Sequence, residues 1–207
     1  MSASHGVVPD RAARATRGGL APLARRLHAA GISANAVTAL GGLLTLGGAG
    51  LLAAERPLAA LGVLFLGSIA DTLDGAIARA AGGGSPLGAF LDSTVDRIAD
   101  SAFFAAAAWI GATRNDALLF WAAIVALTAS YLVSYVRAKA ESLGVSAAVG
   151  PAPREARLVI LLIGLAAWAL TGSLPLFVTA VAAVALLAAI TLLQRIVVVA
   201  RTLGAAR

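Results

Sequence analysis

The sequence predicts an all-α membrane protein in which six transmembrane helices follow a short interfacial amphipathic helix. The first observation behind this prediction is composition, because 60% of the 207 residues are hydrophobic, 13% are charged and the mean hydropathy is +0.91. A soluble domain carries about 25% charged residues, so this composition is typical of a membrane protein. The second observation is a series of apolar runs separated by short turns, and the third is the concentration of basic residues at one end of those runs.

The chain is expected to form one domain with short ends. Residues 1–16 are polar and are predicted to be a mobile cytoplasmic N-terminus, residues 17–203 the transmembrane domain, and residues 204–207 a short tail. Within the domain, leucines at helical spacing lie beside arginines over residues 17–30. This pattern is typical of a juxtamembrane helix that lies on the cytoplasmic surface of the membrane without crossing it.

Six apolar segments are predicted to cross the membrane, and turn residues separate each segment from the next. The predicted spans are residues 39–54, 58–80, 86–112, 117–137, 158–170 and 176–200. The fifth span is short for a hydrocarbon core of about 30 Å and is expected to use flanking residues. Six crossings place both termini on one side. Only Arg56 and Arg114, of sixteen Lys and Arg residues, fall in the outer turns, so the positive-inside rule places the termini in the cytoplasm.

Four aspartates lie within this apolar sequence. Asp71 and Asp74 are three residues apart, and Asp92 and Asp96 are four apart, so each pair shares one face of a helix. The GGGSP run between the pairs predicts a turn, and the two helices would bring all four carboxylates together near a membrane surface. Four like charges at one site require cations. No His or Cys accompanies them, so the all-oxygen ligand set suits Mg²⁺, Mn²⁺ or Ca²⁺ and argues against zinc.

The same carboxylates allow other interpretations. They are also compatible with helix-end charges paired with arginines, or with the cation-binding site of a channel or divalent-cation transporter. Ionisable residues at membrane depth are usually functional, which favours a site over a structural pairing. The net charge of +6 fits a protein beside anionic lipid that handles phosphorylated substrates. A nucleic-acid partner is not expected, because the basic residues flank the spans and form no continuous patch.

One pattern of fixed residue types extends over 26 residues of this region. It reads Asp71-x-x-Asp74-Gly75-x-x-Ala78-Arg79, then eight residues, then Gly88-x-x-x-Asp92-x-x-x-Asp96. This pattern resembles the full signature of the CDP-alcohol phosphotransferases, with every position and every gap matched. The resemblance implies a membrane enzyme with two Mg²⁺ ions, for which Mn²⁺ is a possible substitute. Such an enzyme transfers a phosphatidyl or similar group from a CDP-linked donor to an alcohol.

The resemblance also implies roles for individual residues. Asp96 would accept the proton of the attacking hydroxyl and would be the catalytic residue. The residues implied as metal ligands are Asp71, Asp74, Asp92 and Asp96. The residues implied in binding the donor, CDP-diacylglycerol, are Asn35, Thr38, Gly75, Arg79, Ser85 and Gly88. Two simpler roles stay open from the residues themselves, since Asn35 and Thr38 also suit a helix start and Gly75 also suits close helix packing.

A second group of polar residues follows in the second half of the chain. Arg195 lies within an apolar run, where a guanidinium needs an anion, and its planar fork suits a phosphate. Three segments in this half, residues 134–141 (SYVRAKAE), the pair Arg154-x-x-Arg157 and Gln194-Arg195, look most like the phosphatidylinositol phosphate synthases of actinobacteria within the family. That resemblance implies a pocket for the phosphate of inositol 1-phosphate, formed by Ser134, Arg137, Arg154 and Arg195.

Two departures from the subfamily pattern leave the acceptor open. Arg137 stands where a lysine is usual, and Pro153 stands where a glutamate is expected. The alternative acceptor is glycerol 3-phosphate, which would make the chain a phosphatidylglycerophosphate synthase. The resemblance further implies a homodimer in the cell membrane, in contact with the lipid bilayer and with its active site facing the cytoplasm.

Overall fold

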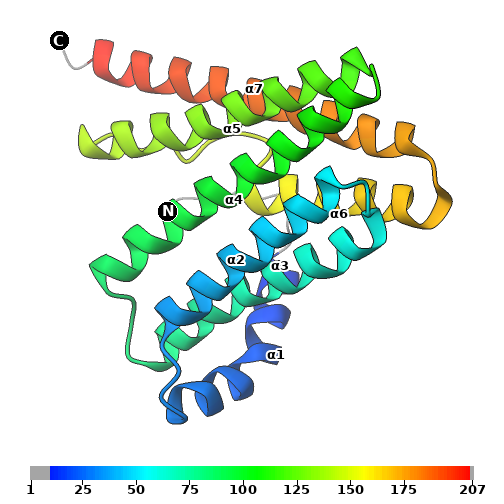
Figure 1. Cartoon of the computed structure of the whole chain (residues 1–207). Helices are drawn as coiled ribbons and strands as arrows, with labels where there is room; N and C mark the ends of the chain where they lie inside the picture. Colours follow the sequence, from blue (N-terminus) through cyan, green and yellow to red (C-terminus); the bar gives the residue numbers. More distant parts are fainter. Residues whose placement is uncertain (1–9, 206–207) are drawn as a thin grey trace. The chain divides into compact units, whose positions relative to one another are not determined.

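The computed structural model describes residues 10–205 (Figure 1). These residues form seven α-helices joined by short connections, and no strand occurs among them. The helices are α1 (Asp10–Ala29), α2 (Ala34–Ala53), α3 (Pro57–Ala80), α4 (Pro86–Thr113), α5 (Ala117–Ser142), α6 (Arg154–Thr171) and α7 (Leu174–Gly204). The predicted all-α class is confirmed. Residues 1–9 and 206–207, which include most of the predicted mobile N-terminus and half of the tail, lie outside the described residues.

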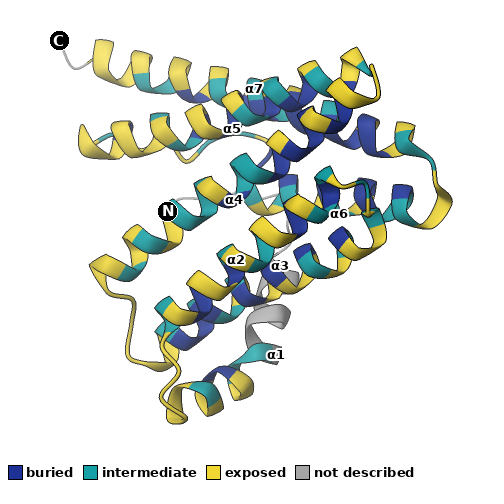
Figure 2. Cartoon of the chain, viewed as in Figure 1, coloured by how far each residue is buried: buried dark blue, intermediate teal, exposed yellow. Residues whose placement is uncertain are grey.

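Four of these helices are long and apolar enough to cross a membrane, namely α2, α3, α5 and α7. The other two predicted spans, α4 and α6, do not qualify by length and composition. Charged residues explain the difference, because α4 carries three aspartates and an arginine, and the first turn of the 18-residue α6 contains Arg154, Glu155 and Arg157. Large apolar side chains remain exposed along the helices, as the exposed residues in Figure 2 indicate, and this is the expected state of a lipid-facing surface.

The helix α1 begins earlier than the apolar pattern predicted. Its predicted range was 17–30, whereas the observed helix starts at Asp10 and ends at Ala29. The added residues are mostly alanine and arginine, which are strong helix formers, but they carry no apolar periodicity that would have marked them. At the other end, Ala24 is 1% exposed and belongs to a small core with Val37 and Ile77, which joins α1 to α2 and α3.

The described chain divides into two compact units. The N-terminal unit contains α1 to α3 and α4 as far as Ala106, and the C-terminal unit contains the rest of α4 from Ala107 and α5 to α7. In the C-terminal unit, α7 packs against both α5 and α6 (Figure 1). The rings of Trp168 and Phe177 stack between α6 and α7 with their centroids 5.5 Å apart.

Within the N-terminal unit, α2 lies along α3 at a distance that only small residues allow (Figure 1). A Cβ atom on Gly48 would lie 2.6 Å from Cγ of Leu64, and one on Gly41 would lie 3.2 Å from Cβ of Ala70. Small residues at helix contacts permit close backbone approach and dense packing in membrane proteins. This approach sets the start of α2 against the end of α3, where the carboxylates lie.

We predict that Gly48→Ala destabilises the protein, because the added methyl group overlaps the buried side chain of Leu64. Overpacking of this kind costs about 1–3 kcal/mol. Gly47→Ala is the matched control, since no atom lies within 4 Å of the Cβ position at Gly47. Thermal unfolding of the two variants in detergent measures the difference. Equal apparent melting temperatures would show that the α2–α3 contact does not need glycine at position 48.

Candidate functional site

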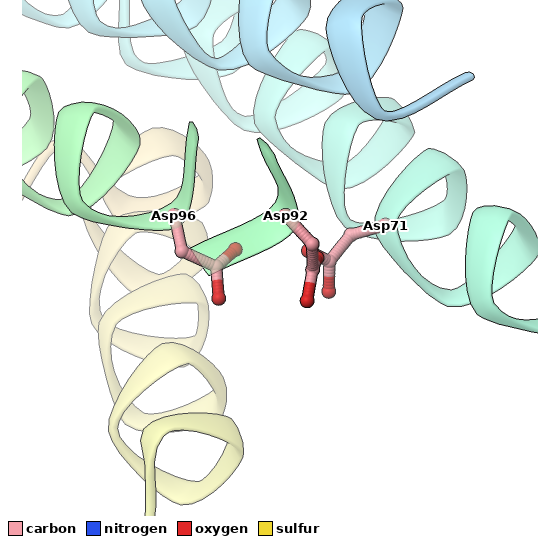
Figure 3. Close-up of side chains that lie close together, drawn as sticks. All are labelled: Asp71, Asp92 and Asp96. Atoms are coloured by element: carbon pink, nitrogen blue, oxygen red, sulfur yellow. The ribbon is translucent and has the colours of Figure 1, made fainter. Parts of the chain in front are cut away.

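Three of the predicted carboxylates form a cluster. Oxygen atoms of Asp71 in α3 and of Asp92 and Asp96 in α4 all lie within 4.8 Å of one another. Figure 3 shows Asp92 and Asp96 extending from one helix toward the side chain of Asp71 on another. Of the four aspartates that were predicted to come together, these three do so.

The turn between α3 and α4 creates this arrangement. Gly82 and Gly83 have φ angles of 94° and 129°, which favour glycine, and they reverse the chain directly after α3 ends. Ser85 then caps α4, because its Oγ accepts a hydrogen bond from the backbone N–H of Gly88 at 3.0 Å. Pro86 follows at the first helical position, where its missing N–H is not needed. The predicted hairpin is thus observed.

The fourth carboxylate, Asp74, lies apart from this cluster. It is 6% exposed, and its Oδ2 accepts a hydrogen bond from the hydroxyl of Thr38 in α2 at 2.6 Å. Asp71 and Asp92 are close enough to interact with Asp74 electrostatically. The site therefore has three clustered carboxylates and one buried neighbour that is held by another helix.

The cluster has the chemistry of a site for a hard divalent cation. Its oxygen atoms are close enough to bind a common ion, and their negative charges repel unless a cation lies among them. A positive group also lies beside the cluster, since Nη2 of Arg97 is 3.5 Å from Oδ2 of Asp96. Arg97 directly follows the last aspartate of the motif, but it is not part of the motif, so the pattern did not indicate it.

A pocket of about 520 Å³ opens beside the carboxylates, entirely within the N-terminal unit. The first residues of α2 and α4 and the last turns of α3 line it. Five of the six predicted donor-binding residues are among them, together with Asp74 and Asp92: Asn35, Thr38, Gly75, Ser85 and Gly88. His28 also lines this pocket, which its position in a basic helix end did not reveal.

Two helix N-termini contribute to this pocket. Ser33 caps α2 by accepting a hydrogen bond from the N–H of Ala36 at 3.2 Å, and Ser85 caps α4. The N-terminus of a helix carries a partial positive charge, so two such ends favour an anionic ligand. The cap of α2 is thus Ser33, whereas Asn35 and Thr38 lie within the helix, and all three residues line the pocket.

The two motif glycines differ in what surrounds them. A Cβ atom on Gly88 would lie 3.1 Å from Oδ1 of Asn35, so this glycine lets α2 and α4 approach. A Cβ atom on Gly75 would meet only Nη1 of Arg79, at 3.3 Å, on the same helix. No neighbouring helix in the described chain comes within 4 Å of that position, so close helix packing does not explain Gly75. Arg79, the sixth predicted donor residue, lies over Gly75 and does not line the pocket.

The predicted acceptor residues all lie in the C-terminal unit. Arg195 is 8% exposed and donates hydrogen bonds from Nε to the carbonyl of Val149, at 3.0 Å, and from Nη1 to the carbonyl of Val133, at 2.9 Å. These bonds use two of the five N–H donors of the guanidinium. The side chain therefore ties α7 to α5 and to the α5–α6 connection, a role that its position in the sequence did not indicate.

The other three acceptor residues lie on the helices next to this contact. Ser134 follows Val133 on α5, and Arg154 begins α6. Arg137 forms an exposed ion pair with Glu141, with 2.8 Å between Nε and Oε1, and is close enough to Arg195 to interact electrostatically.

Parts of the α5–α6 connection are buried. Ala147 and Ala152 are fully or almost fully buried, and buried Arg157 donates from Nη1 to the carbonyl of Ala152 at 2.8 Å. Gly150 has a φ angle of 124°, and a Cβ atom there would overlap Thr191 of α7. This connection therefore packs closely against α7, at Thr191 and beside Arg195.

A comparison with known proteins identifies the family. The sequence model for CDP-alcohol phosphatidyltransferase matches residues 31–193, well over half of the chain. The chain belongs to the CDP-alcohol phosphatidyltransferase family. This finding confirms the resemblance that the aspartate motif indicated, and both groups of predicted site residues, except Arg195, lie within the matched range.

Several curated relatives of this phosphatidyltransferase chain are named phosphatidylinositol phosphate synthase. The protein of Mycobacterium marinum is 38% identical over 151 residues, an alignment that covers 69% of this chain and 62% of the relative. The chain thus spans just under two thirds of that protein's length. The protein of Mycolicibacterium smegmatis is 36% identical over 198 residues, covering 89% of this chain and 85% of the relative.

Solved structures of the same family share the fold. Phosphatidylinositol phosphate synthase of Mycobacterium tuberculosis with CDP-DAG bound is 34% identical, with a TM-score of 0.81 over 87% of this chain and 93% of that chain. The same enzyme in complex with manganese and citrate is 34% identical, with a TM-score of 0.80 over 87% of this chain and 88% of that chain.

We predict that Gly150→Ala destabilises the C-terminal unit for two reasons. Alanine is strained at the positive φ angle of this position, and its methyl group would overlap Thr191. Gly144→Ala is the matched control, since Gly144 also has a positive φ, 74°, but no atom lies within 4 Å of its Cβ position. The two variants should differ by about 1–3 kcal/mol in unfolding measurements in detergent. Adding Thr191→Ser to Gly150→Ala removes the overlapping methyl group and should restore part of the loss. If Thr191→Ser restores no stability, the overlap with Thr191 does not cause the loss in Gly150→Ala.

Proposed function

We propose that this chain is a membrane enzyme that transfers a phosphatidyl group from CDP-diacylglycerol to the hydroxyl of inositol 1-phosphate, with release of CMP. The observation that carries the proposal is the cluster of three carboxylates beside a pocket lined by two helix N-termini, in a chain of this family. The names of the relatives, and the solved relative with CDP-DAG bound, support the choice of donor and acceptor.

The carboxylates would hold two Mg²⁺ ions, with Mn²⁺ as a substitute. Asp71, Asp92 and Asp96 offer a shared set of oxygens, and Asp74 offers a further oxygen from the adjacent turn of α3. The manganese complex of the M. tuberculosis relative supports a divalent metal. When bound, the metal ions neutralise the carboxylates and the donor diphosphate and stabilise negative charge on the leaving CMP.

The residues of the pocket bind and orient the donor. The N-termini of α2 and α4 favour the diphosphate, and the absence of a side chain at Gly75 leaves space above α3 for the nucleotide. Asn35 and Ser85 provide polar groups at the lining, and Arg79 provides a cation beside Gly75.

The half-buried Asp96 acts as the general base. It takes the proton of the acceptor hydroxyl as the hydroxyl oxygen forms a bond to the phosphorus that bears diacylglycerol. The bond between this phosphorus and the bridging oxygen of CMP breaks, and CMP leaves with the electron pair. The phosphate of the acceptor is bound by Ser134, Arg137, Arg154 and Arg195 in the C-terminal unit.

The proposal includes a membrane arrangement. Six helices, α2 to α7, cross the cell membrane, α1 lies at its surface, and the carboxylates face the cytoplasm. Support comes from four helices with the length and composition of spans, and from the distribution of the basic residues. The protein is proposed to act as a homodimer, an expectation that comes from the family resemblance alone.

The deciding experiment supplies the purified protein with labelled CDP-diacylglycerol, Mg²⁺ and one candidate alcohol at a time. Inositol 1-phosphate should yield labelled phosphatidylinositol phosphate and CMP. A preference for glycerol 3-phosphate would assign the alternative function, phosphatidylglycerophosphate synthesis. Equal use of free inositol and inositol 1-phosphate would contradict the phosphate pocket. Failure to release CMP with any alcohol would contradict an enzyme of this class and revive the cation transporter.

We predict that Asp96→Asn lowers turnover by about 10²–10⁴-fold while leaving donor binding largely intact, because the amide has the shape of the carboxylate but is a poor base. The control is Asp100→Asn, which changes the same group one helical turn further along α4 and should keep most of the activity. Rates at saturating substrate compare the two variants. Asp96→Asn activity within a few-fold of the wild-type rate would remove Asp96 from the role of base.

We predict that Arg195→Lys raises the apparent KM for inositol 1-phosphate about tenfold with little change in that for CDP-diacylglycerol. The reason is that an ammonium keeps the charge but loses the planar fork, and a charge-assisted contact is worth about 1.5–3 kcal/mol. Arg201→Lys, at an exposed position near the end of α7, is the control. Equal increases in both KM values would indicate that Arg195 acts only through its contacts with Val133 and Val149.

A further inference from the structure

A buried hydrogen bond joins the start of α2 to the end of α3. The hydroxyl of Thr38 lies 2.6 Å from Oδ2 of Asp74, and the two residues are 36 positions apart in the sequence. Thr38 is 8% exposed and Asp74 is 6% exposed, so little water competes with this bond. Among the four aspartates of the motif, Asp74 is the one that stands outside the carboxylate cluster.

The direction of this bond follows from its chemistry. An ionised carboxylate can only accept, so the hydroxyl of Thr38 must be the donor. The same hydroxyl lies 3.1 Å from the carbonyl of Ala34, but it has a single proton. The shorter contact, to a charged acceptor, is the stronger one. With its proton given to Asp74, Thr38 has no proton left to donate to a phosphate of the donor.

The bond also restricts how Asp74 can bind a cation. The hydroxyl uses one lone pair of Oδ2, and the bond opposes rotation of the carboxylate about its side-chain torsions. The backbone N–H of Gly75 also hydrogen-bonds to this carboxylate. Oδ1 is the oxygen that the bond from Thr38 leaves free for a cation. Asp71 and Asp92 are close enough to act on Asp74 electrostatically, so a cation between them and Asp74 would be attracted from both sides.

We propose that Thr38 is a positioning residue, which orients Asp74 as a one-oxygen ligand for a divalent cation and does not itself bind the donor. This inference rests on the metal site of the proposed function, and it replaces the direct donor contact that the sequence suggested for Thr38. Residues that hold metal ligands by hydrogen bonds typically contribute ten- to a hundredfold to metal affinity.

The test measures Mn²⁺ binding to the purified, donor-free protein in detergent, followed by the loss of the electron paramagnetic resonance signal of free Mn²⁺. Thr38→Val replaces the hydroxyl by a methyl group of similar shape and should weaken the binding of one Mn²⁺ ion about tenfold. Thr38→Ser keeps the hydroxyl and should bind within about threefold of the wild type.

A matched control lies on the same helix. Thr45 is partly buried, and its hydroxyl donates to the carbonyl of Gly41 within α2. Thr45→Val should leave Mn²⁺ binding unchanged, although it removes the same chemical group. Thermal unfolding of Thr38→Val and Thr45→Val shows whether either change affects folding, and Thr38→Ala is the second variant if Thr38→Val does not fold.

A double-mutant cycle tests whether Thr38 acts through Asp74. In an Asp74→Asn background, Thr38→Val should cause no further loss of Mn²⁺ affinity. Equal losses in both backgrounds would overturn the proposal, as would unchanged Mn²⁺ binding in Thr38→Val. An increase in the KM for CDP-diacylglycerol with unchanged Mn²⁺ binding would instead make Thr38 a donor contact. Because Mn²⁺ binding needs no turnover, a protein that shows the expected losses but transfers nothing would contradict the proposed function alone.

Discussion

Repulsion among the three clustered carboxylates is the constraint on which the rest of the N-terminal unit depends. Oxygens within 4.8 Å of one another separate unless the backbone holds them together, or a cation is bound between them. The backbone contributes to this through the short turn of positive-φ glycines that reverses the chain between α3 and α4. This turn brings the two helices back together, so that their carboxylates can share an ion.

The second unit is organised around a different kind of polar residue. Arg195 gives two of its donors to backbone carbonyls, so a charged group in an apolar helix serves as a tie between segments. A guanidinium with five donors can hold its neighbours and still contact an anion, whereas an ammonium has three and lacks the fixed fork. This difference is why arginine, among the basic residues, suits a position that ties segments together and that would also contact the acceptor phosphate under the proposed function.

Local patterns predicted much of this molecule, and contacts between distant segments were not predictable from the sequence. The spacing of the aspartates and the GGGSP run were sufficient for the hairpin and for three members of the cluster, because helix period and turn chemistry are local. The separate position of Asp74 was not predictable, since it depends on Thr38 from another helix. The close contact between Gly150 and Thr191 likewise joins residues 41 positions apart, and the sequence around neither residue indicates it.

The buried pair of Thr38 and Asp74 also has a consequence for evolution and engineering of the protein. Replacing a buried polar pair by apolar residues of similar volume is often neutral or stabilising, because no charge then has to leave water. A selection for thermal stability that ignores activity would therefore favour apolar residues at positions 38 and 74. On the proposed role of Thr38, the polar pair persists against that selection because Asp74 has to bind a cation. Under this proposal, its presence in a sequence would distinguish a working member of the family from one that keeps only the fold.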